Sequence, residues 1–150
     1  MKKRMRLTLL ACIAIVLLAG CEQKSAPTLS AVTEGIDIDL SVLSNTVIYS
    51  QIDNMLSEPW NYLGKTVRIK GALNFYVNDW GDSCSSVLVA DATACCSQGI
   101  EFVWKNDGVS SDFYPSIGDE ITVTGRFETY ERDGSNFIHL VDADVAWETI

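Results

Sequence analysis

The sequence lacks most of the parts from which enzymes build familiar catalytic sites. It contains a single histidine, His139, among 150 residues. It has no Gly-x-Ser-x-Gly nucleophile elbow, no glycine-rich phosphate loop, no His-Glu-x-x-His motif and no Cys-x-x-Cys motif. Because hydrolytic triads, histidine-rich metal centres and dithiol redox sites need these parts, their absence favours a binding protein over an enzyme.

Long apolar runs are also scarce, and the one that exists lies at the N-terminus. Residues 7–20 are apolar except for Thr8, and four basic residues precede them. A run of this length fits the core of an export signal and falls short of the ~20 residues that a membrane-spanning helix needs. Residues 1–20 are therefore predicted to be a signal peptide.

The end of this segment, Leu18-Ala19-Gly20-Cys21, resembles the lipobox of bacterial lipoproteins. The resemblance implies cleavage before Cys21 and modification of Cys21 with diacylglyceryl and acyl (palmitate) groups. Several acyl chains anchor a protein stably, whereas one chain does not. We therefore expect a cell-membrane lipoprotein that faces the extracytoplasmic side. An ordinary secretory signal and an uncleaved anchor helix are the alternatives.

Positive charge is rare after the predicted signal peptide. Seven basic and twenty acidic residues follow Gly20, which gives the remaining chain a net charge of −13. An acidic surface repels phosphate backbones and anionic lipid head groups. The composition therefore predicts no binding to nucleic acid. The expected partners are the membrane, through the lipid on Cys21, and an envelope protein or a small ligand.

The rest of the chain divides into a tether and one domain. Residues 21–35 are small and polar, as in a flexible linker. Residues 36–150 are predicted to form the domain. Its first residues, 36–44, begin by alternating apolar and acidic side chains, which indicates a short strand or an extended lead-in. Apolar residues at helical spacing between residues 47 and 56, ahead of Pro59, predict one short amphipathic helix.

Two segments, Gly64–Gly71 and Gly118–Gly125, share one pattern. Each has a glycine, two polar residues and then apolar alternation that ends in a second glycine. The first glycine suits a turn, and the second falls inside a strand, where a missing side chain permits a bend or a bulge. Two long strands, bent at Gly71 and Gly125, are therefore predicted.

Shorter strands are predicted at residues 87–90, 100–104 and 137–141, with turns at 97–99 and 133–135. Five strands, two of them bent at glycine, indicate an all-β domain with one short helix, a small five-stranded OB-like barrel. A small β-sandwich is the alternative.

Residues 37–145 also resemble a group of uncharacterised bacterial lipoproteins with an OB-fold-like domain. The resemblance rests on Ile38-Asp39-Leu40, on Tyr62–Val67, on the Asp91–Phe102 segment DATACCSQGIEF, and on Tyr114-Pro115 with Gly118-Asp119-Glu120. Related Cys-Cys segments occur in the soluble partner of a two-component bacterial permease. The resemblance implies a fold and an anchor, but no activity, substrate or catalytic residue.

Three cysteines, Cys84, Cys95 and Cys96, remain for the domain, an odd number in an exported protein. A strand from Cys84 to residue 91 would be about 23 Å long, against ~5.5 Å between the Cα atoms of a disulfide. A bridge from Cys84 to the pair would therefore require residues 78–86 to fold back.

On a strand, Cys95 and Cys96 would face opposite sides, so one thiol is expected to pack inward and the other to face outward. Structural packing ranks first, a vicinal disulfide second and a Zn²⁺ or Cu⁺ site third. Such a metal site would have only Cys84 and His139 as further ligands. A thiol-dependent role in metal handling or redox chemistry is therefore the alternative function.

Ligand contacts are expected from aromatic residues near the second and third barrel strands, where OB-folds bind their ligands. Trp80 and Trp104 are the candidates, although Trp104 also suits a core position. The sequence thus predicts a lipid-anchored binding or interaction module, non-enzymatic and without a cofactor.

Overall fold

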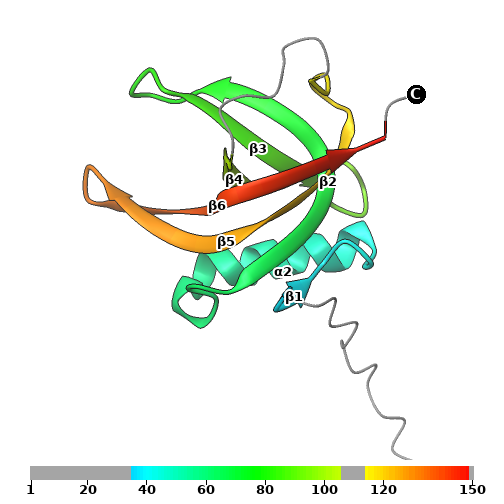
Figure 1. Ribbon diagram of the computed structural model, residues 1–150, viewed down its shortest axis with the longest axis horizontal. Helices are drawn as coiled ribbons and strands as arrows, with labels where there is room; N and C mark the ends of the chain where they lie inside the picture. The colour runs from blue at the N-terminus through cyan, green and yellow to red at the C-terminus, as the bar shows by residue number, and fades with distance from the viewer. Residues whose placement is uncertain (1–34, 106–113, 149–150) are drawn as a thin grey trace, which may run out of the picture. The chain divides into compact units, whose positions relative to one another are not determined.

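The computed structural model describes residues 35–105 and 114–148 (Figure 1). The elements in these ranges are β1 (Ile38–Asp39), α2 (Asn45–Ser57), the short 3-10 helix η1 (Pro59–Asn61), β2 (Thr66–Val77), β3 (Ser83–Ala90), β4 (Ser97–Trp104), β5 (Glu120–Arg132) and β6 (Ser135–Trp147). None of the helices in these ranges is long and apolar enough to cross a membrane. The predicted signal peptide, Cys21 and most of the predicted tether lie outside the described residues.

The strands pair in an order that returns to its starting point. β2, β3 and β4 form an antiparallel meander, β4 pairs in parallel with β6, β6 pairs with β5, and β5 pairs with β2. This closed order is that of a five-stranded Greek-key barrel, the OB-fold. The predicted OB-like β-barrel with one helix is therefore confirmed, and the chain does not form the alternative sandwich. The two-residue β1 adds a parallel partner to β2.

The core fills the barrel and continues onto α2. Alternate residues of each strand point inward, and the fully buried Phe127 of β5 is the largest of them. Ile48, Ile52 and Met55 lie on one stripe of α2 and are completely buried in the same cluster. Each such side chain contributes roughly 1.5–3 kcal/mol when it leaves water. The predicted amphipathic helix is confirmed, and α2 lies against the barrel (Figure 1).

Gly71 marks the place where β2 changes its partner. Up to Ala72, β2 pairs with β5, and from Ala72 onward it pairs with β3. A Cβ atom on Gly71 would lie 2.4 Å from the carbonyl oxygen of Leu88, so no larger residue fits without moving the backbone. At Gly125 the register of β5 and β6 shifts, and the extra residue on β6 is Asp142, at φ 52°. The predicted glycine-dependent bend and bulge are both present.

The predicted hairpin turn at residues 133–135 is confirmed, since Asp133 and Gly134 both adopt positive φ angles between β5 and β6. The predicted turn at residues 97–99 is wrong, because these residues are the start of β4. Gly99 is needed there for close approach, since a Cβ atom would lie 2.6 Å from the carbonyl oxygen of Val87. The chain turns earlier, between Asp91 and Cys96.

Substitution of Gly71 should cost more stability than substitution of Gly134. We expect Gly71→Ala to lower the free energy of unfolding by ~3 kcal/mol, because the new methyl group overlaps a strand backbone. Gly134→Ala meets open space and should lose only ~1 kcal/mol through its positive φ angle. Urea denaturation of both variants measures the difference. Equal losses would contradict the close approach of β2 and β3.

Candidate functional site

Glu101 lies on the outer surface of the barrel. Its neighbours on β4, Ile100 and Phe102, are buried in the core, so Glu101 points outward. Strand pairing aligns it with Ser86 on β3 and with His139 on β6. We call the outward-facing surface around this residue the Glu101 face; it comprises Tyr76, Cys84, Glu101, Tyr130 and His139, whereas the aligned Ser86 is buried.

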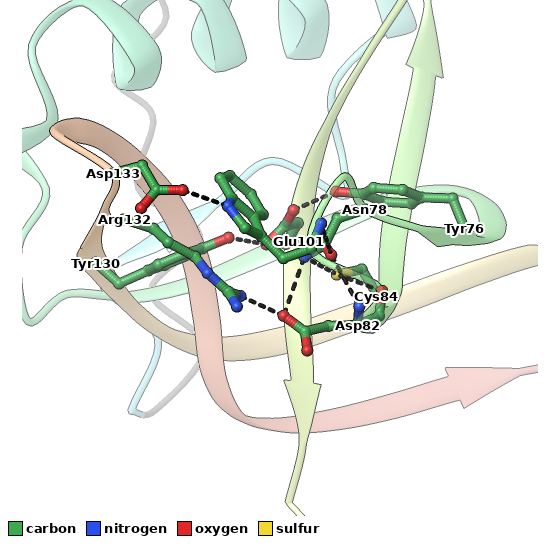
Figure 2. A network of polar contacts seen from close by, with 9 residues as sticks. Tyr76, Asn78, Asp82, Cys84, Glu101, Tyr130, Arg132 and Asp133 are labelled. Atoms are coloured by element: carbon green, nitrogen blue, oxygen red, sulfur yellow. Dashed lines mark hydrogen bonds and ion pairs between the residues drawn. The ribbon is translucent and has the colours of Figure 1, made fainter.

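Two tyrosines from distant strands converge on this carboxylate (Figure 2). The Tyr76 hydroxyl of β2 donates a hydrogen bond to Oε1 of Glu101, and the Tyr130 hydroxyl of β5 donates to Oε2 at 2.7 Å. Burial, and then the Glu101 carboxylate, raise the pKa of each tyrosine. Both phenols therefore remain protonated donors, and Glu101 connects β2, β4 and β5 through side chains.

Cys84 and His139 lie on this face and not beside the Cys-Cys pair. Cys84 is half-buried, and burial followed by the nearby Glu101 raises the pKa of its thiol, so it is a poor nucleophile at neutral pH. The His139 ring packs 4.8 Å from the Tyr130 ring, and burial lowers its pKa while Glu101 opposes that shift. Cys84 and His139 therefore do not join Cys95 and Cys96 in a four-ligand metal site.

Two loops meet beside the Glu101 face (Figure 2). Trp80, in the β2–β3 loop, donates a hydrogen bond from Nε1 to the Asp133 carboxylate in the β5–β6 turn. The Arg132 guanidinium forms an ion pair with Asp82 and lies 4.6 Å from the centre of a Trp80 ring. Trp80 also packs edge-on against Phe137, with centroids 5.6 Å apart. These contacts join the two loops across the face.

Trp104 has a different environment from Trp80. Its ring is half-buried against the core, with centroids 5.3 Å from Phe102 and 5.2 Å from Tyr114. Its Nε1 donates a hydrogen bond to Ser85 at 3.1 Å. Of its two predicted roles, ligand contact and core packing, Trp104 therefore has the core position. Of the two candidate tryptophans, only Trp80 lies in the loops beside the Glu101 face.

Cys95 and Cys96 lie in the turn between β3 and β4, where both are exposed. The expectation that one thiol packs inward is wrong, because it assumed a strand at these positions. Ala94 has a φ angle of 55°, which turns the chain just before the pair. The alternation of a strand does not apply to residues in such a turn, so structural packing does not explain either cysteine.

Sequence reasoning missed Asp91, which lies with the two thiols, and Glu101, Tyr130 and Arg132, which form the Glu101 face and its edge. A local signal existed for Asp91, because an Asp followed two residues later by a Thr is typical of a side-chain-stabilised turn. No local signal existed for the other three, since their contacts depend on the pairing of strands far apart in the sequence.

No protein-family model matches this chain, and neither does any curated protein. Among solved structures, the chain is similar to one titled "Plasmodium falciparum SSB complex with ssDNA". The identity is 14%, the match covers 58% of this chain and 96% of the other, and the TM-score is 0.36.

The predicted exclusion of nucleic acid is contradicted by this match, whose title places a similar chain in a complex with single-stranded DNA. The exclusion was wrong because net charge describes the whole chain and not the local surface that a ligand meets. At this identity and TM-score, the match does not assign DNA binding to the present chain.

Mild acid should destabilise the barrel through His139. Burial lowers its pKa in the folded protein below the ordinary value of 6.5, so its contribution to stability is complete above that pH and is lost as the pH falls through the folded pKa. We expect the free energy of unfolding to fall as the pH is lowered below about 6.5. His139→Gln should flatten that fall in urea denaturation. An identical pH profile in the variant would contradict the assignment to His139.

Proposed function

We propose that this chain is a non-enzymatic, lipid-anchored extracytoplasmic binding module whose ligand surface is the Glu101 face together with Trp80. OB-folds bind ligands on the second and third barrel strands and on the loops that follow the first and fourth. In this chain those elements are β3, β4, the β2–β3 loop and the β5–β6 turn. Glu101 lies on β4 and Trp80 in the β2–β3 loop, and Tyr76 of β2 and Tyr130 of β5 donate hydrogen bonds to Glu101. This gathering is the observation that supports the proposal.

A ligand with a guanidinium or ammonium group suits this surface best. The chain already holds one such group there, the Arg132 guanidinium, between the Trp80 ring and the Asp82 carboxylate. A cation over an aromatic ring gains roughly 0.5–2 kcal/mol. The Glu101 carboxylate adds negative charge close to aromatic rings, and the acidic surface raises the local concentration of cations.

The anchor in this proposal rests on the N-terminal residues. The basic start, the apolar run and the Leu18-Ala19-Gly20-Cys21 segment together support export and lipid attachment at Cys21. A domain tethered in this way would present its ligand surface close to the outer side of the membrane that holds it.

The anchor can be tested with Cys21→Ala, which should block incorporation of radiolabelled fatty acid and cause the uncleaved precursor to accumulate. Cys12→Ala removes a thiol from within the signal itself and is the matched control, which should label like the wild type. Labelling that persists in Cys21→Ala would exclude Cys21 as the site of lipid attachment and would leave the proposed binding surface untouched.

The ligand surface can be tested by fluorescence anisotropy of a labelled arginine peptide added to the full-length protein in detergent micelles. We expect binding that weakens about tenfold or more in Glu101→Gln and in Trp80→Ala, because each removes a principal contact with the cation. Glu131→Gln, an exposed residue of β5, changes the net charge equally and should leave the affinity unchanged. Circular dichroism checks that each variant is folded.

A short oligothymidylate with the same label distinguishes the two ligand classes. If oligothymidylate binds in a manner that depends on Trp80 and the peptide does not bind, the ligand class is nucleic acid and the proposed cationic ligand is wrong. An equal loss of affinity in Glu131→Gln and Glu101→Gln would show that only general charge attracts the peptide, and it would contradict the proposed surface.

A further inference from the structure

The turn between β3 and β4 gathers two exposed thiols and a half-buried carboxylate. Asp91, Cys95 and Cys96 each offer one ligand atom, and these three atoms lie within 4.8 Å of one another. The two Sγ atoms are 3.5 Å apart, and Sγ of Cys95 lies 3.4 Å from Oδ2 of Asp91. Neighbouring cysteines point to the same side here because the chain turns between them and β3.

Backbone hydrogen bonds fix the carboxylate in place. The N–H groups of Thr93 and Cys95 donate to Oδ1 of Asp91 at 3.0 and 3.1 Å, and the Thr93 hydroxyl donates to the same carboxylate. The Asp91 N–H donates to the Cys96 carbonyl at 2.9 Å, which closes the turn. Oδ1 is thus held by the backbone, while Oδ2 lies toward the thiol of Cys95.

No ion pair in residues 35–105 and 114–148 involves Asp91, so none of them balances the charge of this cluster. Ionisation of both thiols would place three negative charges within a few ångströms. A bound cation would offset the repulsion among these charges and favour both thiolates.

We propose that Asp91, Cys95 and Cys96 bind one Zn²⁺ ion, with solvent in the fourth position. On binding, each thiol passes its proton to solvent and forms one Zn–S bond, so no oxidant or reductant takes part. Two Zn–S bonds of ~2.3 Å at a tetrahedral angle place their sulfur atoms about 3.8 Å apart. The observed separation of 3.5 Å needs only a small adjustment to reach that value.

The ligand set favours zinc over copper(I). A carboxylate is a hard ligand that soft Cu⁺ does not prefer, whereas Zn²⁺ accepts both sulfur and oxygen. Structural zinc sites are closed by four protein ligands, whereas this turn supplies three, the exposed Cys95 and Cys96 and the half-buried Asp91. The site is therefore suited to exchange of zinc with a partner or with solvent, rather than to holding the fold together. It lies beyond the end of β3 opposite to Cys84, and it does not depend on the ligand surface proposed above.

The test uses the full-length protein, purified in detergent, reduced, stripped with a chelator and titrated with Co²⁺, a spectroscopic substitute for Zn²⁺. We expect one Co²⁺ per chain with the visible absorption of tetrahedral thiolate coordination, and displacement by one Zn²⁺. Cys95→Ser and Cys96→Ser should each abolish this absorption. Asp91→Asn keeps the acceptor that the turn needs but removes the charge, so it should weaken Co²⁺ binding about tenfold or more.

The matched control is Cys84→Ser, which removes a thiol outside the turn and should bind Co²⁺ like the wild type. Three results would overturn the site: no thiolate absorption in the reduced wild-type protein, unchanged binding in Cys95→Ser or Cys96→Ser, or unchanged affinity in Asp91→Asn. Isolation of the wild type with a Cys95–Cys96 disulfide that takes up no Co²⁺ after reduction would also overturn it, in favour of a vicinal disulfide.

Discussion

Every other arrangement in this domain depends on the close approach of β2 and β3 at Gly71. The backbone of β2 comes so near the Leu88 carbonyl that only a residue without a side chain fits between them. Because of this contact, one strand can pair with β5 along its first half and with β3 along its second half. The sheet therefore closes on itself, and side chains from β2, β4 and β5 reach one outer surface.

The Glu101 face follows from that closure. Tyr76 and Tyr130 are separated by more than fifty positions in the sequence, yet both donate hydrogen bonds to the same carboxylate. The closed barrel also brings the β2–β3 loop beside the β5–β6 turn, where Trp80 contacts Asp133 and Arg132. A carboxylate at the centre and a tryptophan at the edge give this surface both charge and an aromatic contact.

The two ends of β3 carry different chemistry. At its start, Cys84 is half-buried near Glu101, and burial and the negative charge both raise the pKa of its thiol. Beyond its end, Cys95 and Cys96 are exposed beside Asp91, whose carboxylate is fixed by backbone donors. Cysteine by itself therefore does not determine the role of a position, because exposure and neighbouring charge decide whether a thiol can bind a metal.

The sequence by itself determined the elements whose signals are local. Apolar periodicity located α2 and the alternating strands, and paired glycine patterns located the bends at Gly71 and Gly125, which together indicated the OB-like barrel. A glycine signal is ambiguous, however, because both a turn and a close approach require the absence of a side chain. Gly99 was assigned to a turn for that reason, and the misplaced turn put Cys95 and Cys96 on a strand.

Only the tertiary structure decided which side chains meet. The contacts of Glu101 with Tyr76 and Tyr130, and of Trp80 with Arg132, depend on strand register across the closed barrel. The grouping of Asp91 with two thiols depends on backbone angles in the β3–β4 turn. Composition and spacing predict neither the contacts of the Glu101 face nor the grouping of Asp91 with the thiols. Strand register is set by the summed packing of the core and not by the residues at the site.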